Sequence, residues 1–318
     1  MTAFGEFEFI AELLAPLAAE GGLGLTDDAA ILPKLRHGEA WTVTNDMMVE
    51  GVHYLADDLP DLIARKLIRV NVSDLAAMGA RPVGYTLALS SDGKRNRDWF
   101  ARFCSGLAED QAAFGIGLFG GDTTSTPGPF TLSLTAFGAA PRGEALRRNG
   151  ARPGDAVWVS GTLGDAALGL RVLQGALAVP EDVAEILARR YRLPEPRPEL
   201  GQSLRGLATS CLDVSDGLAA DLGHVAKHSR VGIEIDADRV PVSDAARAAM
   251  KHDAALAPLP LTGGDDYELA FTLPDGMEPP EAGRVHCTRI GRVIEGDAVS
   301  VLRNGQPVTL ESAGWRHF

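Results

Sequence analysis

The chain is poor in cysteine and aromatic residues, has fewer basic than acidic residues, and contains no long apolar run. Its three cysteines are far apart and form no CxxC pair, which argues against a disulfide framework or a structural zinc site and is typical of a reducing cytoplasm. A net charge of −13 argues against partners such as nucleic acid or a membrane surface. No apolar segment approaches the roughly 18 residues of a membrane span, and the acidic N-terminal stretch does not resemble a signal peptide.

Strand-like and helix-like segments alternate through both halves of the 318 residues, which predicts an α/β (α+β) fold. Strands are expected at 41–44, 83–89, 116–119, 130–137, 156–160, 211–214, 232–235, 267–272, 287–293 and 299–302. Helices are expected at 6–19, 61–78, 97–114, 164–174, 181–191, 197–208 and 218–228. The stretch 140–155 is rich in Arg, Gly and Pro and predicts a boundary between domains 1–140 and 150–318.

Two motifs suggest chemistry that their context does not support. Gly115, Gly117 and Gly120 match the spacing of the dinucleotide fingerprint, but here the glycines lead into a strand instead of opening a helix. His224 and His228 have the spacing of zinc ligands, but the Glu of HExxH is missing. No P-loop sequence is present.

Aspartates recur beside Gly, Ser, Thr or Asn where strands or turns are expected to end. The six segments are Thr26-Asp-Asp28, Thr44-Asn-Asp46, Asn71-Val-Ser-Asp74, Gly120-Gly-Asp-Thr-Thr124, Asp213-Val-Ser-Asp-Gly217 and Gly263-Gly-Asp-Asp266. Strand ends meet where an α/β fold builds its site, so we expect these carboxylates to converge. Two unit charges 4 Å apart repel by about 4 kcal/mol at an effective dielectric near 20, so such a cluster requires cations. Oxygen ligands favour Mg²⁺. Because protein-bound Mg²⁺ also binds phosphate oxygens, the cluster is a candidate site for a Mg–polyphosphate.

These segments, together with Gly51-Val-His53, Asn149–Asp155 and Ser160–Asp165, closely resemble the bacterial thiamine-monophosphate kinases over nearly the whole chain, from Gly5 to Trp315. The wider superfamily is that of aminoimidazole ribonucleotide synthetase. The resemblance implies two domains with the active site in the cleft between them, and a homodimer. It also implies direct in-line transfer of a phosphoryl group from ATP to thiamine monophosphate, with several Mg²⁺ ions, giving thiamine diphosphate.

The resemblance also implies roles for individual residues. The expected metal ligands are Asp28, Thr44, Asn45, Asp46, Asp74, Asp122, Asp213 and Asp216, of which Asp46 and Asp122 are also expected to be catalytic. The expected ATP contacts are Gly121, Asp122, Arg148 and Ser215. His53, Asp265 and Trp315 would contact thiamine monophosphate, and an indole suits the cationic thiazolium.

Three positions depart from the family's usual pattern. Thr26 stands where the family usually has Gly, Asn45 where it has Thr, and Asp265 where it has Glu. Two alternatives to a kinase remain, and the departures support only the second. One is another ATP-using member of the superfamily, although no cysteine precedes Cys104, which argues against selenophosphate synthetase. The other is a catalytically silent protein that binds Mg–ATP.

Overall fold

The computed structural model describes residues 5–251 and 253–315, and within it the chain divides into two compact units. The first unit comprises residues up to 75 and residues 80–142. The second comprises residues 76–79 and the chain from 143 onwards. No helix in the described ranges is both long enough and apolar enough to cross a membrane.

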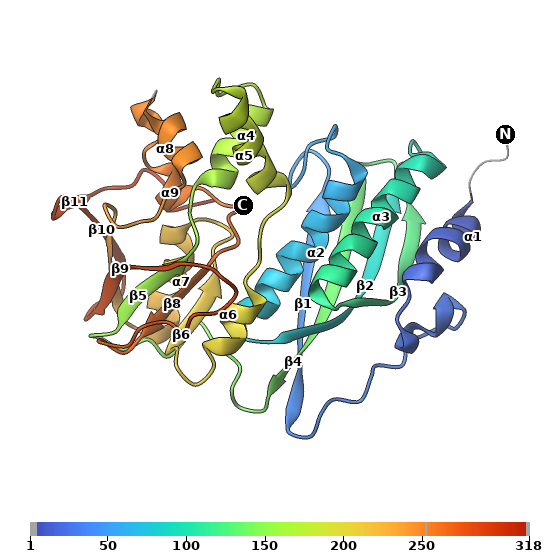
Figure 1. Cartoon of the computed structure of the whole chain (residues 1–318), viewed down its shortest axis with the longest axis horizontal. Helices are drawn as coiled ribbons and strands as arrows, with labels where there is room; N and C mark the ends of the chain where they lie inside the picture. Colours follow the sequence, from blue (N-terminus) through green and yellow to red (C-terminus); the bar gives the residue numbers. More distant parts are fainter. Residues whose placement is uncertain (1–4, 252, 316–318) are drawn as a thin grey trace. The chain divides into compact units, whose positions relative to one another are not determined.

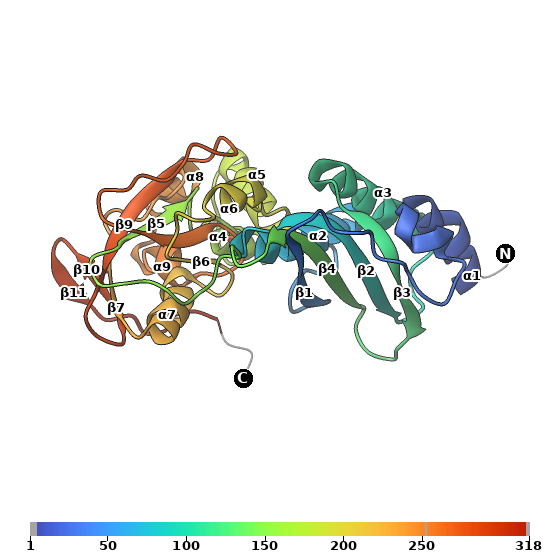
Figure 2. The ribbon, with the colours of Figure 1, turned by 90° about the horizontal axis from the view of Figure 1, so that it is seen from below.

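The first unit is a four-stranded sheet with helices on one face (Figures 1 and 2). Its strands are β1 (Glu39–Val49), β2 (Arg81–Ser91), β3 (Gly117–Ser125) and β4 (Thr131–Pro141), in the order β1-β4-β2-β3. Only β2 and β3 are parallel. The helices α2 (Pro60–Ala77) and α3 (Arg97–Phe114) pack on that face, while α1 (Glu6–Phe9) lies beside β3.

Local signals explain why some helices match the expected bounds and others do not. The helix α3 begins after Asn96, whose side chain caps the N–H of Trp99, and ends at Gly115 in the left-handed conformation. The expected helix 6–19 is broken into α1, a π-helical turn at Ile10–Leu14 and a 3₁₀ turn at Ala15–Leu17. Pro16 has no N–H to continue an α-helix there.

The second unit is built on a seven-stranded mixed sheet in the order β11-β10-β7-β9-β5-β8-β6. The strands are β5 (Ala156–Ser160), β6 (Ser210–Asp213), β7 (Gly232–Asp236), β8 (Leu269–Leu273), β9 (Cys287–Ile294), β10 (Val299–Arg303) and β11 (Gln306–Val308). The helices are α4 (Asp165–Leu173), α5 (Glu181–Arg192), α6 (Pro198–Ser203), α7 (Leu218–Ser229), α8 (Asp244–Met250) and α9 (Leu259–Thr262).

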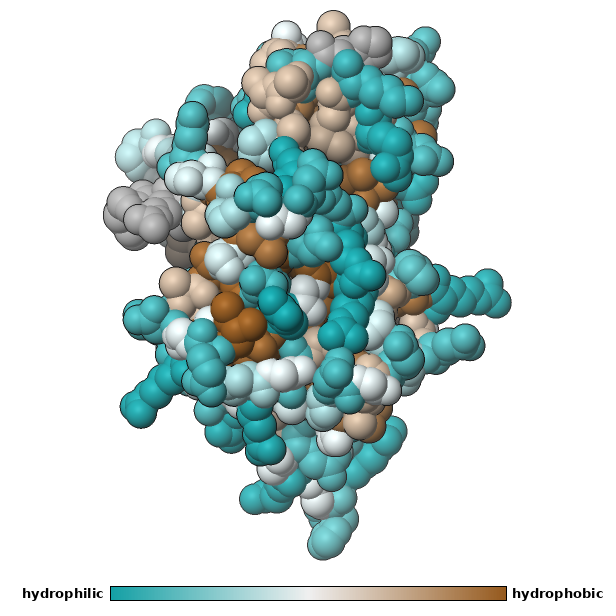
Figure 3. All heavy atoms as spheres, turned by 90° about the vertical axis from the view of Figure 1, so that its left-hand side faces the viewer, coloured by the Kyte–Doolittle hydropathy of each residue, from teal (hydrophilic) through white to brown (hydrophobic). Residues whose placement is uncertain are grey.

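Strand β5 shows how this sheet is buried on both faces. Val157 and Val159 join the core formed with α7, whereas Ala156 and Trp158 join the core formed with α6. Side chains alternate along a strand, so a fully buried strand requires apolar layers on both sides. The outer surface seen in Figure 3 is mainly hydrophilic, with apolar side chains in small patches.

The strands of the first unit extend further than the sequence pattern indicates. Asp46 lies inside β1 and Asp122 inside β3, although both were expected to follow a strand. The polar residues around them are accommodated because main-chain pairing continues past the apolar core. The expected helix 197–208 is shorter, ending at Ser203, and neither α8 nor β11 was anticipated.

Candidate active site

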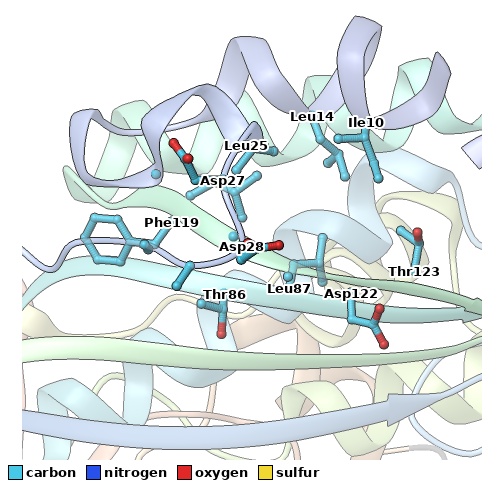
Figure 4. A pocket seen from close by; sticks show the side chains of 16 residues that line it. Ile10, Leu14, Leu25, Asp27, Asp28, Thr86, Leu87, Phe119, Asp122 and Thr123 are labelled. Carbon is cyan, nitrogen blue, oxygen red and sulfur yellow. The ribbon is translucent and has the colours of Figure 1, made fainter. Parts of the chain in front are cut away.

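The first unit contains a pocket of about 370 Å³ between the N-terminal segment and the strands β2 and β3 (Figure 4). Asp27, Asp28 and Asp122 contribute carboxylates to its lining. Ile10 and Leu14 contribute an apolar wall on the opposite side, as Figure 4 shows. The pocket therefore combines acidic and apolar surfaces, as a site for a metal-bound organic phosphate requires.

Gly121 and Thr26 show how the backbone is accommodated in the segments that form the pocket. A Cβ atom on Gly121 would lie 1.8 Å from the carbonyl oxygen of Leu87, so only glycine fits between β2 and β3. Thr26, which replaces a family glycine, has φ of −106°. Its backbone is ordinary, so this departure does not strain the turn that carries Asp27 and Asp28.

A second acidic group lies where β1 faces α2. Thr44 and Asp46 alternate on the half-buried face of β1, and the Thr44 hydroxyl donates a hydrogen bond to Asp74 on α2. Burial, together with the nearby charge of Asp74, raises the pKa of Asp46 to about 7. A cation bound between the two carboxylates would reverse this effect by favouring the ionised form.

The aspartates of the first unit do not form the single cluster that was expected. Asp46 lies on β1 and Asp122 on β3, which are the two edge strands of the sheet. Asp46 is in register with Leu134, Leu134 with Leu87, and Leu87 with Gly121, the residue before Asp122. Three strand spacings thus separate Asp46 from this part of β3, roughly 14 Å. Among the residues that the structure describes, no three His, Cys, Asp or Glu side chains come close enough to hold one metal ion.

Asn45 is separated from Thr44 and Asp46 because neighbouring residues on a strand point to opposite faces. Its side-chain nitrogen donates hydrogen bonds to β4, at 3.1 Å to Ser133 Oγ, 3.0 Å to the Leu134 carbonyl and 2.9 Å to Thr135 Oγ1. The structure therefore does not bring this side chain into the group formed by Thr44 and Asp46.

His53 lies in a turn just after β1, where hydrogen bonds hold both its side chain and its main chain. Its Nδ1 accepts the N–H of Val49 at 3.1 Å, and its carbonyl accepts a hydrogen bond from the buried Lys66 Nζ at 3.0 Å. Because Nδ1 is an acceptor, the neutral ring carries its proton on Nε2. The His53 side chain is thus prepared to donate a hydrogen bond.

In the second unit, the loop between β6 and α7 gathers five of the expected residues. Asp213 is the last residue of β6, and Ser215 and Asp216 follow it. The Ser215 carbonyl accepts the N–H of Asp265 at 2.8 Å, and the Asp216 carbonyl accepts the N–H of Trp315 at 2.9 Å. Residues that are 50 and 99 positions apart in the sequence therefore meet at one loop.

The segment that carries Asp265 is strained and firmly anchored. Asp265 and Tyr267 have φ of 68° and 53°, values that non-glycine residues rarely adopt. Asp266 is buried and accepts the N–H groups of Gly164 and Ala166, and burial raises its pKa to about 8. The surrounding contacts hold the strained backbone in place.

Glu268 provides the second anchor of this segment and was not singled out in the sequence. Arg197 binds it in a bidentate manner, with Nε 2.7 Å from Oε2 and Nη2 2.5 Å from Oε1. Arg190 Nη2 lies 3.1 Å from Oε1, and the Ser160 hydroxyl donates to Oε2 at 2.6 Å. The glutamate is fully buried, so its role here is structural.

Asp221 on α7 was also missed, although it faces the same loop. Its pKa is raised to about 7 by burial and by the charge of Asp216, against the effect of three backbone N–H bonds that lower it. The sequence signal was available, because an acidic residue in the first turns of a helix commonly accepts free N–H groups.

Arg148 is exposed in the second unit, where its charge acts on His224 of α7. Burial comes first among the causes that lower the pKa of His224, followed by Arg148; Asp216 opposes them. Arg148 and Asp216 therefore both lie within electrostatic range of this side of α7.

The residues present fit a divalent cation in part. Asp46 and Asp74 form a carboxylate pair with a neighbouring hydroxyl, the ligand chemistry of Mg²⁺. Asn71 lies one turn before Asp74 on α2, and its buried Oδ1 has no hydrogen-bond partner. Among the residues that the structure describes, this buried acceptor has no partner, and a metal-bound water would satisfy it.

Comparison with known proteins identifies the family of this chain. The family model "AIR synthase related protein, N-terminal domain" matches residues 26–140, and the corresponding C-terminal model matches 152–303. The chain belongs to this AIR synthase-related family.

Three relatives show to which group within this family the chain belongs. Thiamine-monophosphate kinase of Caulobacter vibrioides is 43% identical over 98% of this chain and 90% of its own. The crystal structure of thiamine-monophosphate kinase from Stenotrophomonas maltophilia is 42% identical, with a TM-score of 0.83 over 93% of this chain and 95% of that one. A solved structure described as AaThiL complexed with AMPPCP and TMP is 31% identical, with a TM-score of 0.81 over 99% and 97%. Within its family, the chain is a member of the thiamine-monophosphate kinases.

Proposed function

We propose that this protein transfers the terminal phosphoryl group of ATP to thiamine monophosphate, producing thiamine diphosphate and ADP. The observation that carries the proposal is the 43% identity to a thiamine-monophosphate kinase over 98% of the chain. The solved relative bound to AMPPCP and TMP supports the same pair of substrates. We assign metal and ATP binding to the N-terminal domain, residues 1–140. Residues 150–318 form the C-terminal domain.

In the first unit, we assign metal binding to two places. Thr44, Asp46 and Asp74 form one, and Asp28 and Asp122 in the pocket form the other. Gly121, which lines the same pocket next to Asp122, is proposed to contact ATP. Asn45 is not included, because its side chain is directed to the other face of β1.

In the second unit, Asp213 and Asp216 are proposed to bind further ions, and Ser215 and Arg148 to contact ATP. Asp265 and Trp315, which join the same loop, are proposed to contact thiamine monophosphate together with His53. The indole of Trp315 is 59% exposed, and an indole is the side chain that binds a cationic ring best.

These residues provide positioning and charge compensation, which is most of what phosphoryl transfer requires. When bound, Mg²⁺ would neutralise the developing charge on the transferred phosphoryl group. The protein's own contribution is to hold carboxylates at fixed positions on β1, α2 and β3. The neutral His53 ring carries its proton on Nε2 and is the imidazole that we assign to thiamine monophosphate.

We also propose that the protein is a cytoplasmic homodimer. Its three cysteines are free thiols, in agreement with a reducing compartment. Val43 and Met47 are each 56% exposed on the sheet face opposite α2 and α3, a surface suited to a second copy. Light scattering of Val43→Asp should report a monomer if this face forms the dimer.

The deciding experiment mixes purified protein, Mg²⁺, ATP and thiamine monophosphate and follows all phosphate species by ³¹P NMR. Thiamine diphosphate should appear one-for-one with ADP, and its formation should stop with EDTA. If ATP binds while thiamine monophosphate stays unchanged, the kinase assignment is wrong and a sibling ATP-using reaction or a silent Mg–ATP binder takes its place.

A further inference from the structure

The Asp221 side chain gathers three consecutive backbone N–H groups. Its Oδ2 accepts hydrogen bonds from Ser215 and Asp216 at 3.1 Å each and from Gly217 at 3.0 Å. The residue is only 5% exposed, so water competes little for these bonds. A single buried carboxylate oxygen thus fixes the direction of three successive peptide groups.

The carbonyl ends of the same peptide groups reach the segments that carry Asp265 and Trp315. The N–H of Asp216 and the carbonyl of Ser215 belong to one peptide group, and that carbonyl accepts the Asp265 N–H at 2.8 Å. The next group donates its Gly217 N–H to Asp221 and accepts the Trp315 N–H at 2.9 Å. A peptide group is planar, so fixing one end fixes where the other end points.

The third peptide group follows the same arrangement. Its N–H, from Ser215, donates to Asp221, and its carbonyl, from Val214, accepts the Tyr267 N–H at 2.8 Å. The fit is close, since a Cβ atom on Gly264 would lie 2.4 Å from the Ser215 carbonyl oxygen. Each of the three peptide groups therefore connects Asp221 to a residue from another part of the chain.

We infer that Asp221 is a positioning residue, which through three rigid peptide groups sets where Asp265 and Trp315 stand relative to Ser215 and Asp216. The inference rests on the proposed function for its catalytic consequence. Its structural content stands independently, because the hydrogen bonds join the segments whether or not a substrate is bound.

Amide hydrogen exchange tests the structural part, using Asp221→Ala and the matched control Asp155→Ala. Asp155 is similarly buried, and it accepts the Arg152 N–H and the Thr209 hydroxyl near the other end of β6. Asp221→Ala should accelerate exchange at Asp265 and Trp315 by about tenfold or more, after correction for global stability. Asp155→Ala should not. Acceleration confined to residues 215–217, or equal in both variants, would overturn the inference.

Kinetics tests the functional part, with Asp221→Asn as the conservative variant. Asp221→Ala should raise KM for thiamine monophosphate by about tenfold, through loss of alignment at Asp265 and Trp315. Asp221→Asn keeps a side-chain acceptor and should restore most of the affinity, while Asp155→Ala should stay near wild type. A KM in Asp221→Ala equal to that of Asp155→Ala would overturn the role. If the wild-type protein does not phosphorylate thiamine monophosphate, the proposed function fails, and hydrogen exchange still decides the role of Asp221.

Discussion

The two units use buried carboxylates in opposite ways. In the second unit, Asp221 and Glu268 are surrounded by donors, namely backbone N–H groups and arginines. In the first unit, Asp46 lies beside the carboxylate of Asp74. Burial and a neighbouring charge raise the pKa of Asp46 to about 7, as they do for Asp221, so the two aspartates differ in their neighbours and not in their pKa. A carboxylate with internal donors supports the fold, whereas paired carboxylates are suited to an ion from outside. The comparison gives a physical criterion for separating structural from functional aspartates.

The strongest test of the comparison is Asp122→Asn in the first unit. Removing one charge from the pocket should lower kcat by at least about a thousandfold, because charge compensation during phosphoryl transfer depends on the bound cation. The fold should be retained, since Asp122 lies at an exposed position of β3. Steady-state kinetics and circular dichroism together check this. Near-normal turnover by a folded variant would remove Asp122 from the site.

The reciprocal test is Glu268→Gln in the second unit. Loss of the negative charge leaves Arg197 and Arg190 without their buried partner, so the free energy of unfolding should fall by about 3 kcal/mol. Urea denaturation measures the change. A stability within about 0.5 kcal/mol of wild type would mean that Glu268 does not anchor the segment.

The contribution of Asp46 to the pH dependence of stability can be isolated by comparing wild type with Asp46→Asn. Its pKa is raised to about 7 in the folded state, so its contribution is fully present below the unfolded value near 4 and is lost as pH rises through 7. In EDTA, wild type should therefore lose on the order of 2 kcal/mol more than Asp46→Asn between pH 5 and 8. Added Mg²⁺ should reduce this difference. Parallel pH profiles of the two proteins would contradict the assignment.

The smallest effect is expected for Trp315→Ala. Its indole is largely exposed, so stability should change little, while KM for thiamine monophosphate should rise about fivefold through loss of a cation–π contact. Trp315→Phe should lie between wild type and the alanine variant. Equal KM values for all three proteins would show that Trp315 does not contact the substrate.

The sequence predicts elements well where a local signal sets both ends. The expected bounds of α3 are those observed, because Asn96 and Gly115 terminate it locally. Strands β1 and β3 continue past their apolar residues because partner strands pair with them, which no local pattern reveals. The Asn304-Gly305 pair before β11 is typical of a two-residue hairpin turn, so this strand also has a local signal in the sequence.

For the site residues too, local sequence does not reveal contacts between distant parts of the chain. The sequence motifs single out Ser215, Asp216, Asp265 and Trp315, and the fold brings these residues together at one loop. The separation of Asp46 from Asp122 depends on strand order, which the motifs do not encode. Asp221 and Glu268 were missed because their importance comes from partners distant in the chain.

The left-handed backbone at Asp265 gives meaning to the departure from the family's usual glutamate. Short polar side chains such as aspartate tolerate a φ of 68° better than longer ones, because they stabilise it by local hydrogen bonding. Here the Tyr267 hydroxyl donates to Asp265 Oδ1 at 3.1 Å. At this position aspartate therefore has one methylene less reach than glutamate, and its short side chain suits the left-handed main chain.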